Sequence, residues 1–155
     1  MRPWNPNIRV QPDVFDIGTE HARLTKNRSD IGGVVAFTGY CRDEGGTLAA
    51  LDLEHYPGMA EGEMTRIAEE ARRRWPLLGL TLIHRSGHIA PGEPIVLVLA
   101  ASAHRQAAFE AASFLMDFLK THAPFWKKEH RADGSEGEWV AAKDADNAAA
   151  ERWRS

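Results

Sequence analysis

The segment Leu78–Lys120 reads LGLTLIHRSGHIAPGEPIVLVLAASAHRQAAFEAASFLMDFLK, and the spacing of its apolar residues changes partway along it. Residues 78–89 and 94–101 are rich in Leu, Ile and Val, which predicts two strands, and the turn sequence APGE at 90–93 joins them. Residues 102–120 predict a helix, with an inward-facing set of Ala108, Ala111, Leu115, Phe118 and Leu119. A strand pair that leads into an amphipathic helix is typical of a sheet covered by a layer of helices.

The sequence on both sides of this segment predicts further strands and helices. The clearest helix covers residues 59–75, where Ala60, Met64, Ile67, Ala71 and Trp75 form one apolar stripe. We also expect strands at 31–41 and 47–56, a weak edge strand at 9–17, a short helix capped by Thr19 that runs to about Asn27, an extended segment at 124–131 and a short strand at 138–142. This mixture predicts one α+β domain over residues 1–142 with two layers, and a tail over 143–155 that is flexible or becomes ordered on assembly.

Composition excludes several classes of protein. The chain has 155 residues, 19 Lys and Arg against 22 Asp and Glu, and one cysteine. One cysteine cannot form an internal disulfide, and a net charge of −3 argues against a protein that coats nucleic acid. The N-terminal residues lack the apolar core of a signal peptide, and the longest apolar run is too short to span a membrane. We therefore expect a cytoplasmic protein.

Positive charge is concentrated in residues 101–132. This segment contains five Lys and Arg residues and three acidic residues. His104, His122 and His130 add further hydrogen-bond donors. The sequence Ser102-Ala-His104-Arg105 lies where a strand gives way to a helix, and the free N–H groups and dipole of a helix start attract anions. This pattern indicates a phosphate or carboxylate site. A solvent-facing first turn with incidental charges explains the same residues.

Two lysines downstream are candidates for chemistry. Lys120 closes the predicted helix, where a cation also suits the helix dipole. Lys127 follows Pro124-Phe125-Trp126 in an extended segment, so it should point to the opposite face from Trp126. A lysine that is partly desolvated among apolar residues has a lowered pKa and a more reactive amine. From the residues alone, catalysis by these lysines and an ordinary surface role both stay open.

Other reactive patterns are weaker. His84 and His88 have the spacing of a helical metal pair, but they fall in a predicted strand with no further ligands, so we expect no metal site. Cys41 adjoins Arg42, which could stabilise a thiolate, yet a small buried hydrophobic side chain is the favoured interpretation. Neither a dinucleotide-binding glycine pattern nor a phosphate-binding P-loop is present, and we expect no cofactor.

Six short segments carry a resemblance to a known family. They are Gly39-Tyr-Cys-Arg42, Leu53-Glu-His-Tyr-Pro-Gly-Met59, Arg74-Trp-Pro76, Ile83-His-Arg85, Ser102-Ala-His-Arg105 and Leu119-Lys-Thr-His-Ala-Pro-Phe-Trp-Lys-Lys-Glu129. In this order, over residues 32–139, they resemble the large, catalytic subunits of molybdopterin synthase. The resemblance implies an α/β-hammerhead type of α+β fold with an additional small antiparallel sheet.

The resemblance also implies a reaction and partners. The family inserts two sulfurs into cyclic pyranopterin monophosphate to form the dithiolene of molybdopterin, a step of molybdenum cofactor biosynthesis. The sulfur arrives as a thiocarboxylate at the C-terminus of a small ubiquitin-like subunit that ends in Gly-Gly. The large subunit forms a homodimer within a heterotetramer. The order of the two sulfur transfers stays open.

By the same resemblance, individual residues take roles. Lys120 is the central catalytic lysine, and Lys127 is a second catalytic lysine that holds the pterin intermediate. Substrate binding falls to Arg42, His104, Arg105 and, as a weaker candidate, Lys128, and two subunits could supply these groups. A non-catalytic module that binds phosphate or nucleic acid with the same cations is the main alternative. A scaffold that binds the small subunit without turnover is another. Cys41 stands where the family more often has an aliphatic residue.

Overall fold

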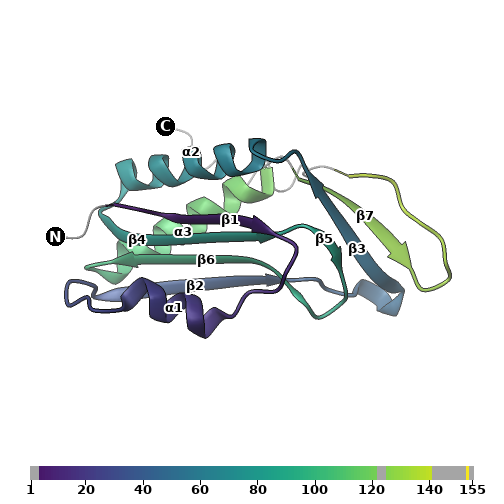
Figure 1. Cartoon of the computed structure of the whole chain (residues 1–155), viewed down its shortest axis with the longest axis horizontal. Helices are drawn as coiled ribbons and strands as arrows, with labels where there is room; N and C mark the ends of the chain where they lie inside the picture. The colour runs from purple at the N-terminus through teal and green to yellow at the C-terminus, as the bar shows by residue number, and fades with distance from the viewer. Residues whose placement is uncertain (1–3, 122–124, 141–152, 154–155) are drawn as a thin grey trace.

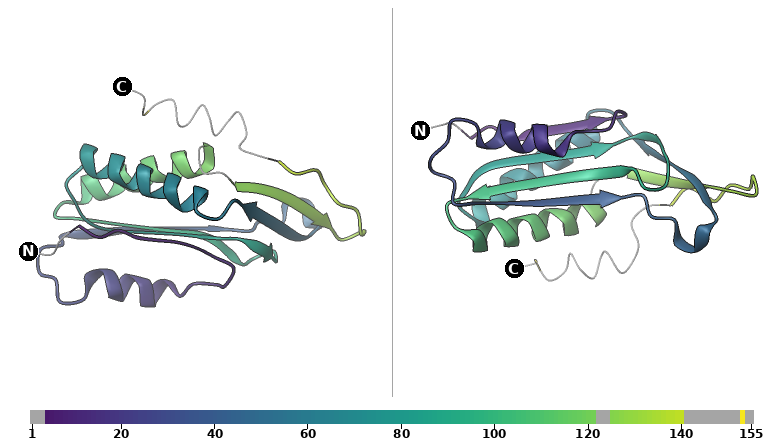
Figure 2. Two further views of the ribbon diagram at one scale, coloured as in Figure 1. Left: turned by 45° about the horizontal axis from the view of Figure 1, so that its top comes forward. Right: turned by 90° about the horizontal axis from the view of Figure 1, so that it is seen from below.

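A computed structural model describes residues 4–121, 125–140 and 153 of the chain. Helices α2 and α3 lie side by side on one face of a four-stranded sheet, α1 lies on the other face, and a small sheet extends from one end (Figures 1 and 2). The elements, in chain order, are β1 (Asn7–Gln11), α1 (Ile17–Thr25), β2 (Gly33–Tyr40), the 3₁₀ turn η1 (Glu44–Gly46), β3 (Leu48–His55), α2 (Met59–Arg74), β4 (Leu77–Arg85), β5 (Gly87–Ile89), β6 (Pro94–Ser102), α3 (Arg105–Thr121) and β7 (Phe125–Arg131). The predicted α+β class is confirmed.

The large sheet has the strand order β1-β4-β6-β2. Both β4 and β2 pair antiparallel with β6, whereas β1 is an edge strand parallel to β4. Along β6, Val96, Val98 and Ala100 pack under α2 and α3, while Leu97 and Leu99 face α1. Because successive side chains of a strand point to opposite faces of the sheet, this fully apolar strand contributes to two cores. The two predicted layers correspond to the sheet and the pair α2 and α3, and α1 adds a further layer on the other face, where it buries few apolar side chains.

The small sheet has the order β5-β3-β7 and is antiparallel throughout, as expected from the family resemblance. The predicted continuous strand 78–89 is wrong, because β4 and β5 belong to different sheets. The break lies at Gly87, whose φ of +83° redirects the chain from the large sheet into the small one.

Several segment ends differ from the prediction; α3, for example, begins at Arg105 and not at Ser102. The cap of α1 is Asp16, whose side chain accepts a hydrogen bond of 3.0 Å from the Thr19 N–H, so Thr19 is not the cap. The strand predicted at 9–17 is shorter and earlier, at 7–11. Residues 138–140 form no strand beyond an isolated bridge between Lys127 and Val140, and residues 141–142 lie outside the described residues.

The predicted tail, residues 143–155, lies outside the described residues except for Trp153. The Trp153 ring contacts Trp75 and Phe114 edge to face, each at 5.7 Å between ring centroids. Its carbonyl accepts a hydrogen bond of 2.6 Å from Arg74. Trp153 thus packs against the larger hydrophobic core. None of the helices within the described residues has the length and apolar character that a membrane crossing requires.

Candidate active site

Lys120 borders a narrow, mainly apolar pocket of about 90 Å³ at the C-terminal end of α3. Its walls come from four elements that the fold brings together: β2, β4, β6 and α3. The lining residues are Phe37, Gly39, Tyr40, His84, Ile95, Val96, Met116, Leu119 and Lys120. Lys120 is exposed in the last turn of α3, where the helix dipole favours its positive charge. A single ammonium at the mouth of an apolar slot suits a slender anionic group.

His84 forms part of the wall of this pocket and is held on two sides. Its ring stacks on Phe125 at 3.7 Å between centroids, with 14° between the planes. Its Nδ1 lies 2.8 Å from the Arg85 carbonyl, and because a carbonyl only accepts, Nδ1 carries the proton. Burial, with a smaller contribution from the nearby Lys120 charge, lowers the pKa of His84 to about 4. His84 is therefore a neutral imidazole beside a cationic lysine.

Lys127 is a residue of β7, and this strand places it close to the pocket. In the register of β7 with β3, Lys127 is opposite Leu53, so both side chains are on the face that packs against Cys41 and Ile89. Phe125 is two residues before Lys127 on the same face, and Phe125 stacks on His84. The fold therefore brings the two predicted catalytic lysines to one end of the molecule, with His84 and Phe125 near them.

Lys128 lies on the opposite face of the same strand. It is opposite Asp52 in the register, and its Nζ is 2.9 Å from Glu136 Oε2 and 5.6 Å from the centroid of the Trp139 ring. The hydrogen bond to Glu136 raises the pKa of Lys128. The structure thus separates Lys128 from Lys127 by the thickness of the sheet.

Cys41 and Arg42 follow the end of β2. The Cys41 side chain is 1% exposed, and its pKa is raised first by burial and then by the carboxylates of Glu93 and Asp43. These features support the interpretation of Cys41 as a buried hydrophobic side chain. The positive charge of Lys127 lowers the pKa of the same thiol, so Lys127 lies near the end of β2. Arg42 is exposed at this end of the molecule.

His104 and Arg105 lie far from these residues within one chain. Both are exposed at the start of α3, where the predicted change from strand to helix is confirmed. Lys120 is fifteen residues after Arg105 along the helix, a distance of about 22 Å at 1.5 Å per residue. One chain therefore carries two groups of candidate residues at the two ends of α3.

A polar network on the outer face of the small sheet was missed by the sequence reasoning. The carboxylate of Asp52 contacts His88 Nδ1 at 3.0 Å and His130 Nε2 at 2.6 Å, and His130 is 3.5 Å from Glu136. The bond with His130 is the main cause of a lowered pKa at Asp52. Within the described residues, no group of three His, Cys, Asp or Glu side chains is arranged to hold a metal ion.

Comparisons with known proteins agree with the geometry. A family model described as "MoaE protein" matches residues 10–122. A molybdopterin synthase catalytic subunit from Mesorhizobium japonicum is 67% identical over 150 residues, covering 97% of this chain and 94% of the relative. The subunit of the same name from Escherichia coli is 49% identical over 148 residues, covering 94% of this chain and 97% of the relative. Because both relatives are named as catalytic subunits, the comparisons favour an enzyme over a non-catalytic phosphate-binding module.

Solved structures show the same fold. The molybdopterin biosynthesis MoaE protein from Burkholderia ambifaria has a TM-score of 0.83 at 46% identity, covering 96% of this chain and 98% of that one. Molybdopterin synthase from Staphylococcus aureus has a TM-score of 0.75 at 26% identity, covering 91% and 98%. The family model covers more than half of the chain, and its relatives match nearly all of it. The chain therefore belongs to the MoaE family, the catalytic subunits of molybdopterin synthase, which act in molybdenum cofactor biosynthesis.

Proposed function

We propose that the pocket beside Lys120 receives the thiocarboxylated C-terminus of a small ubiquitin-like subunit and passes its sulfur to cyclic pyranopterin monophosphate. The observation that carries this proposal is the narrow slot of about 90 Å³ with apolar walls and one ammonium group. A Gly-Gly terminus has no side chains, so it fits a slot that bulkier residues could not enter. Its terminal charge is matched by Lys120.

The two lysines take different parts in this proposal. Lys120 pairs with the thiocarboxylate and engages the acyl group or moves protons during sulfur transfer. Lys127 holds and polarises the pterin intermediate from the neighbouring strand. The sulfur comes from the partner, so no cysteine nucleophile is needed. This agrees with Cys41, whose burial and raised pKa keep it a neutral thiol.

A second copy of the chain completes the site. His104 and Arg105 are about 22 Å from Lys120 within one chain, so they reach a shared substrate only from another subunit. Strand β2 is an edge of the large sheet, and its Phe37 is 43% exposed while it also lines the Lys120 pocket. We propose that a homodimer places His104 and Arg105 of one subunit at the substrate phosphate, near Arg42 and the lysines of the other.

Related structures support a two-component assembly. The Helicobacter pylori structure is described as a complex of subunits 1 and 2 of a molybdopterin-converting factor, and at 19% identity it shares the fold with this chain. We propose that this chain likewise acts with a small subunit, as two copies of each, in the cytoplasm. Lys128 remains the weaker substrate-binding candidate because its ammonium is paired with Glu136 on the other face of the sheet.

The test uses the purified chain, a thiocarboxylated small subunit and cyclic pyranopterin monophosphate, with dithiolene product as the readout. Lys120→Ala and Lys127→Ala should each lower activity by about 100-fold or more, because each removes a charge that acts on the reacting groups. Lys128→Ala tests the weaker candidate and should change activity less than about 3-fold, because its ammonium is already paired with Glu136 on the other face of the sheet. Full activity of Lys120→Ala with a verified partner would contradict the proposal.

A further inference from the structure

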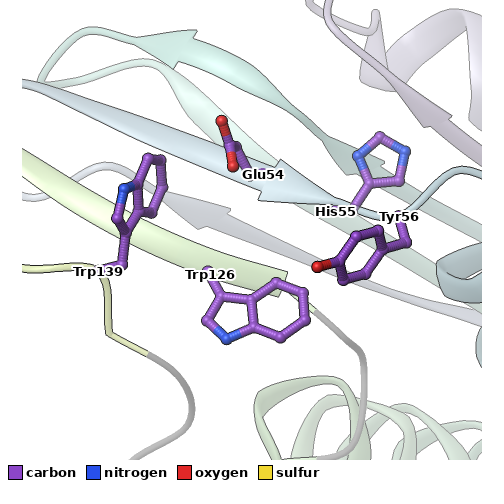
Figure 3. A pocket seen from close by; sticks show the side chains of 5 residues that line it. All are labelled: Glu54, His55, Tyr56, Trp126 and Trp139. Carbon is purple, nitrogen blue, oxygen red and sulfur yellow. The ribbon is translucent and has the colours of Figure 1, made fainter.

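Figure 3 shows a second pocket, which lies at the end of β3 on the outer face of the small sheet. By the register of β3 and β7, Lys127 is on the opposite face. It encloses about 260 Å³ and is lined by Glu54, His55, Tyr56, Trp126 and Trp139. The aromatic rings come from three segments: the end of β3, strand β7 and the loop after β7. Tyr56 and Trp126 meet edge to face at 5.5 Å, with 82° between the planes. We call this site the aromatic pocket.

Glu54 gives the aromatic pocket a negative charge. In the register of the sheet Glu54 is directly opposite Trp126, so its carboxylate and the indole share the outer face. Two other carboxylates of this face are compensated: Asp52 contacts His88 and His130, and Glu136 contacts Lys128. Among the residues that the structure describes, Glu54 forms no hydrogen bond or ion pair. Its charge is therefore available to a ligand.

Aromatic faces and one free carboxylate together select a cation. A ring face attracts an ammonium or guanidinium group, and the attraction grows when the cation is partly desolvated. The molecule already shows this contact at the rim of the pocket, where Lys128 lies 5.6 Å from the centroid of Trp139. Since Glu136 neutralises Lys128, the charge of Glu54 is not cancelled. The volume of about 260 Å³ is enough for one basic side chain and is below that of usual small-molecule sites.

The position of the pocket indicates which molecule supplies this side chain. The pairs Leu53–Lys127 and Glu54–Trp126 are adjacent in the register, so the pocket and the catalytic lysine are on the two faces of the same short segment. A protein whose terminus enters the Lys120 pocket, close to Lys127, therefore has its adjoining surface within reach of the aromatic pocket. The surroundings are also apolar and open, because Tyr56 is 61% exposed, Met59 55% and Trp139 42%.

We propose that the aromatic pocket binds a lysine or arginine side chain of the small subunit and so anchors the body of that subunit while its terminus enters the Lys120 pocket. This inference rests on the proposed function, because it requires that a small subunit docks. It adds a second contact, separate from the site of sulfur transfer and opposite in charge. The terminus is recognised as an anion by lysines, and the body is recognised as a cation by Glu54 and the rings.

The experiment measures the affinity of the purified full chain for the purified small subunit by isothermal titration calorimetry. Glu54→Gln removes the charge and keeps the shape, and it should weaken binding about 5-fold to 10-fold. Glu138→Gln is the matched control, since Glu138 is an exposed carboxylate next to Trp139 that does not line the pocket. The control should change the affinity less than 2-fold. The rate of dithiolene formation at saturating small subunit should stay that of the unchanged chain in both variants.

A wild-type affinity for Glu54→Gln, or an equal loss for both variants, would overturn the inference and leave the proposed function intact. Binding of tetramethylammonium to the aromatic pocket, measured as quenching of tryptophan fluorescence, would also overturn it if the small subunit still binds at saturating tetramethylammonium. In that case the pocket serves a small organic cation. Failure of the unchanged chain to bind the small subunit and to form product would overturn both proposals.

Discussion

His84, a partly buried histidine, makes the stability of the fold depend on pH. Its pKa is lowered to about 4 by burial, whereas an unperturbed histidine titrates near 6.5. Between these values the unfolded chain takes up a proton that the folded chain does not. The free energy of unfolding is therefore complete above about pH 6.5 and falls as the pH drops toward 4, by up to about 3 kcal/mol from this group.

The measurement is urea unfolding from pH 4 to 7 for the unchanged chain and for His84→Phe. The phenyl ring keeps the stack on Phe125 but does not titrate, so the variant should lose less stability as the pH falls. His21→Gln is the control, because His21 is exposed on α1, and its pH slope should match that of the unchanged chain. Parallel pH slopes for His84→Phe and the unchanged chain would show that His84 does not cause the dependence.

For single residues, the sequence predicted the face on which a side chain lies better than it predicted the contacts of that side chain. Alternation along an extended segment placed Lys127 opposite in direction to Trp126, and the register with β3 confirms this. The contacts of Asp52 with His88 and His130 had no signal in the sequence, because they depend on the register between three strands distant in the chain. The catalytic roles of Lys120 and Lys127 came from resemblance and stay predictions.

At the scale of elements, the start of α2 depends on a backbone geometry that only glycine adopts readily. Gly58 has φ of +85° and ψ of −39°, and its N–H donates a hydrogen bond of 3.0 Å to Glu61. Gly58→Ala should lower the free energy of unfolding by about 1–3 kcal/mol, since a Cβ is strained in this conformation. Urea denaturation at neutral pH measures the change.

Gly62, one turn into the same helix, is the control for this substitution. A Cβ at Gly62 would meet nothing within 4 Å, and the position is exposed. Gly62→Ala should therefore raise the free energy of unfolding by about 0.5–1 kcal/mol, because alanine loses less backbone entropy in a helix. A loss of stability in both variants would mean that added bulk, and not the backbone angle, explains the effect at Gly58.

Helices were more predictable than strand boundaries for a physical reason. The stripe from Ala60 to Trp75 repeats over four turns, and α2 ends at Arg74, within one residue of the prediction. Residues 78–89 are apolar throughout, so their pattern does not reveal that the chain leaves one sheet and joins another at Gly87. The short helix α1 was predicted in the right region but about two to three residues late, because Thr19 was taken as its cap and Asp16 is the observed one.

At the scale of the whole molecule, the length of α3 supports the proposal that two subunits form the site. Arg105 and Lys120 are at the two ends of a rigid helix, about 22 Å apart, and a substrate with one phosphate does not span that distance within one chain. A twofold axis that brings the start of one α3 toward the end of the other would create two equal composite sites. In such a composite site Lys120 and Arg105 come from different subunits, whereas in a one-subunit site both would come from the same chain.

The arrangement predicts that two inactive chains can restore one active site. Lys120→Ala and Arg105→Ala should each abolish dithiolene formation as homodimers. In a heterodimer of the two variants, one composite site carries both substitutions, and the other carries Lys120 from one chain and Arg105 from its partner, both unchanged. Co-expression with two different affinity tags allows this heterodimer to be isolated, and with the small subunit it should have about half of the activity of the unchanged dimer. If both residues acted within one subunit, every site would carry one substitution, and the heterodimer would be as inactive as its parents.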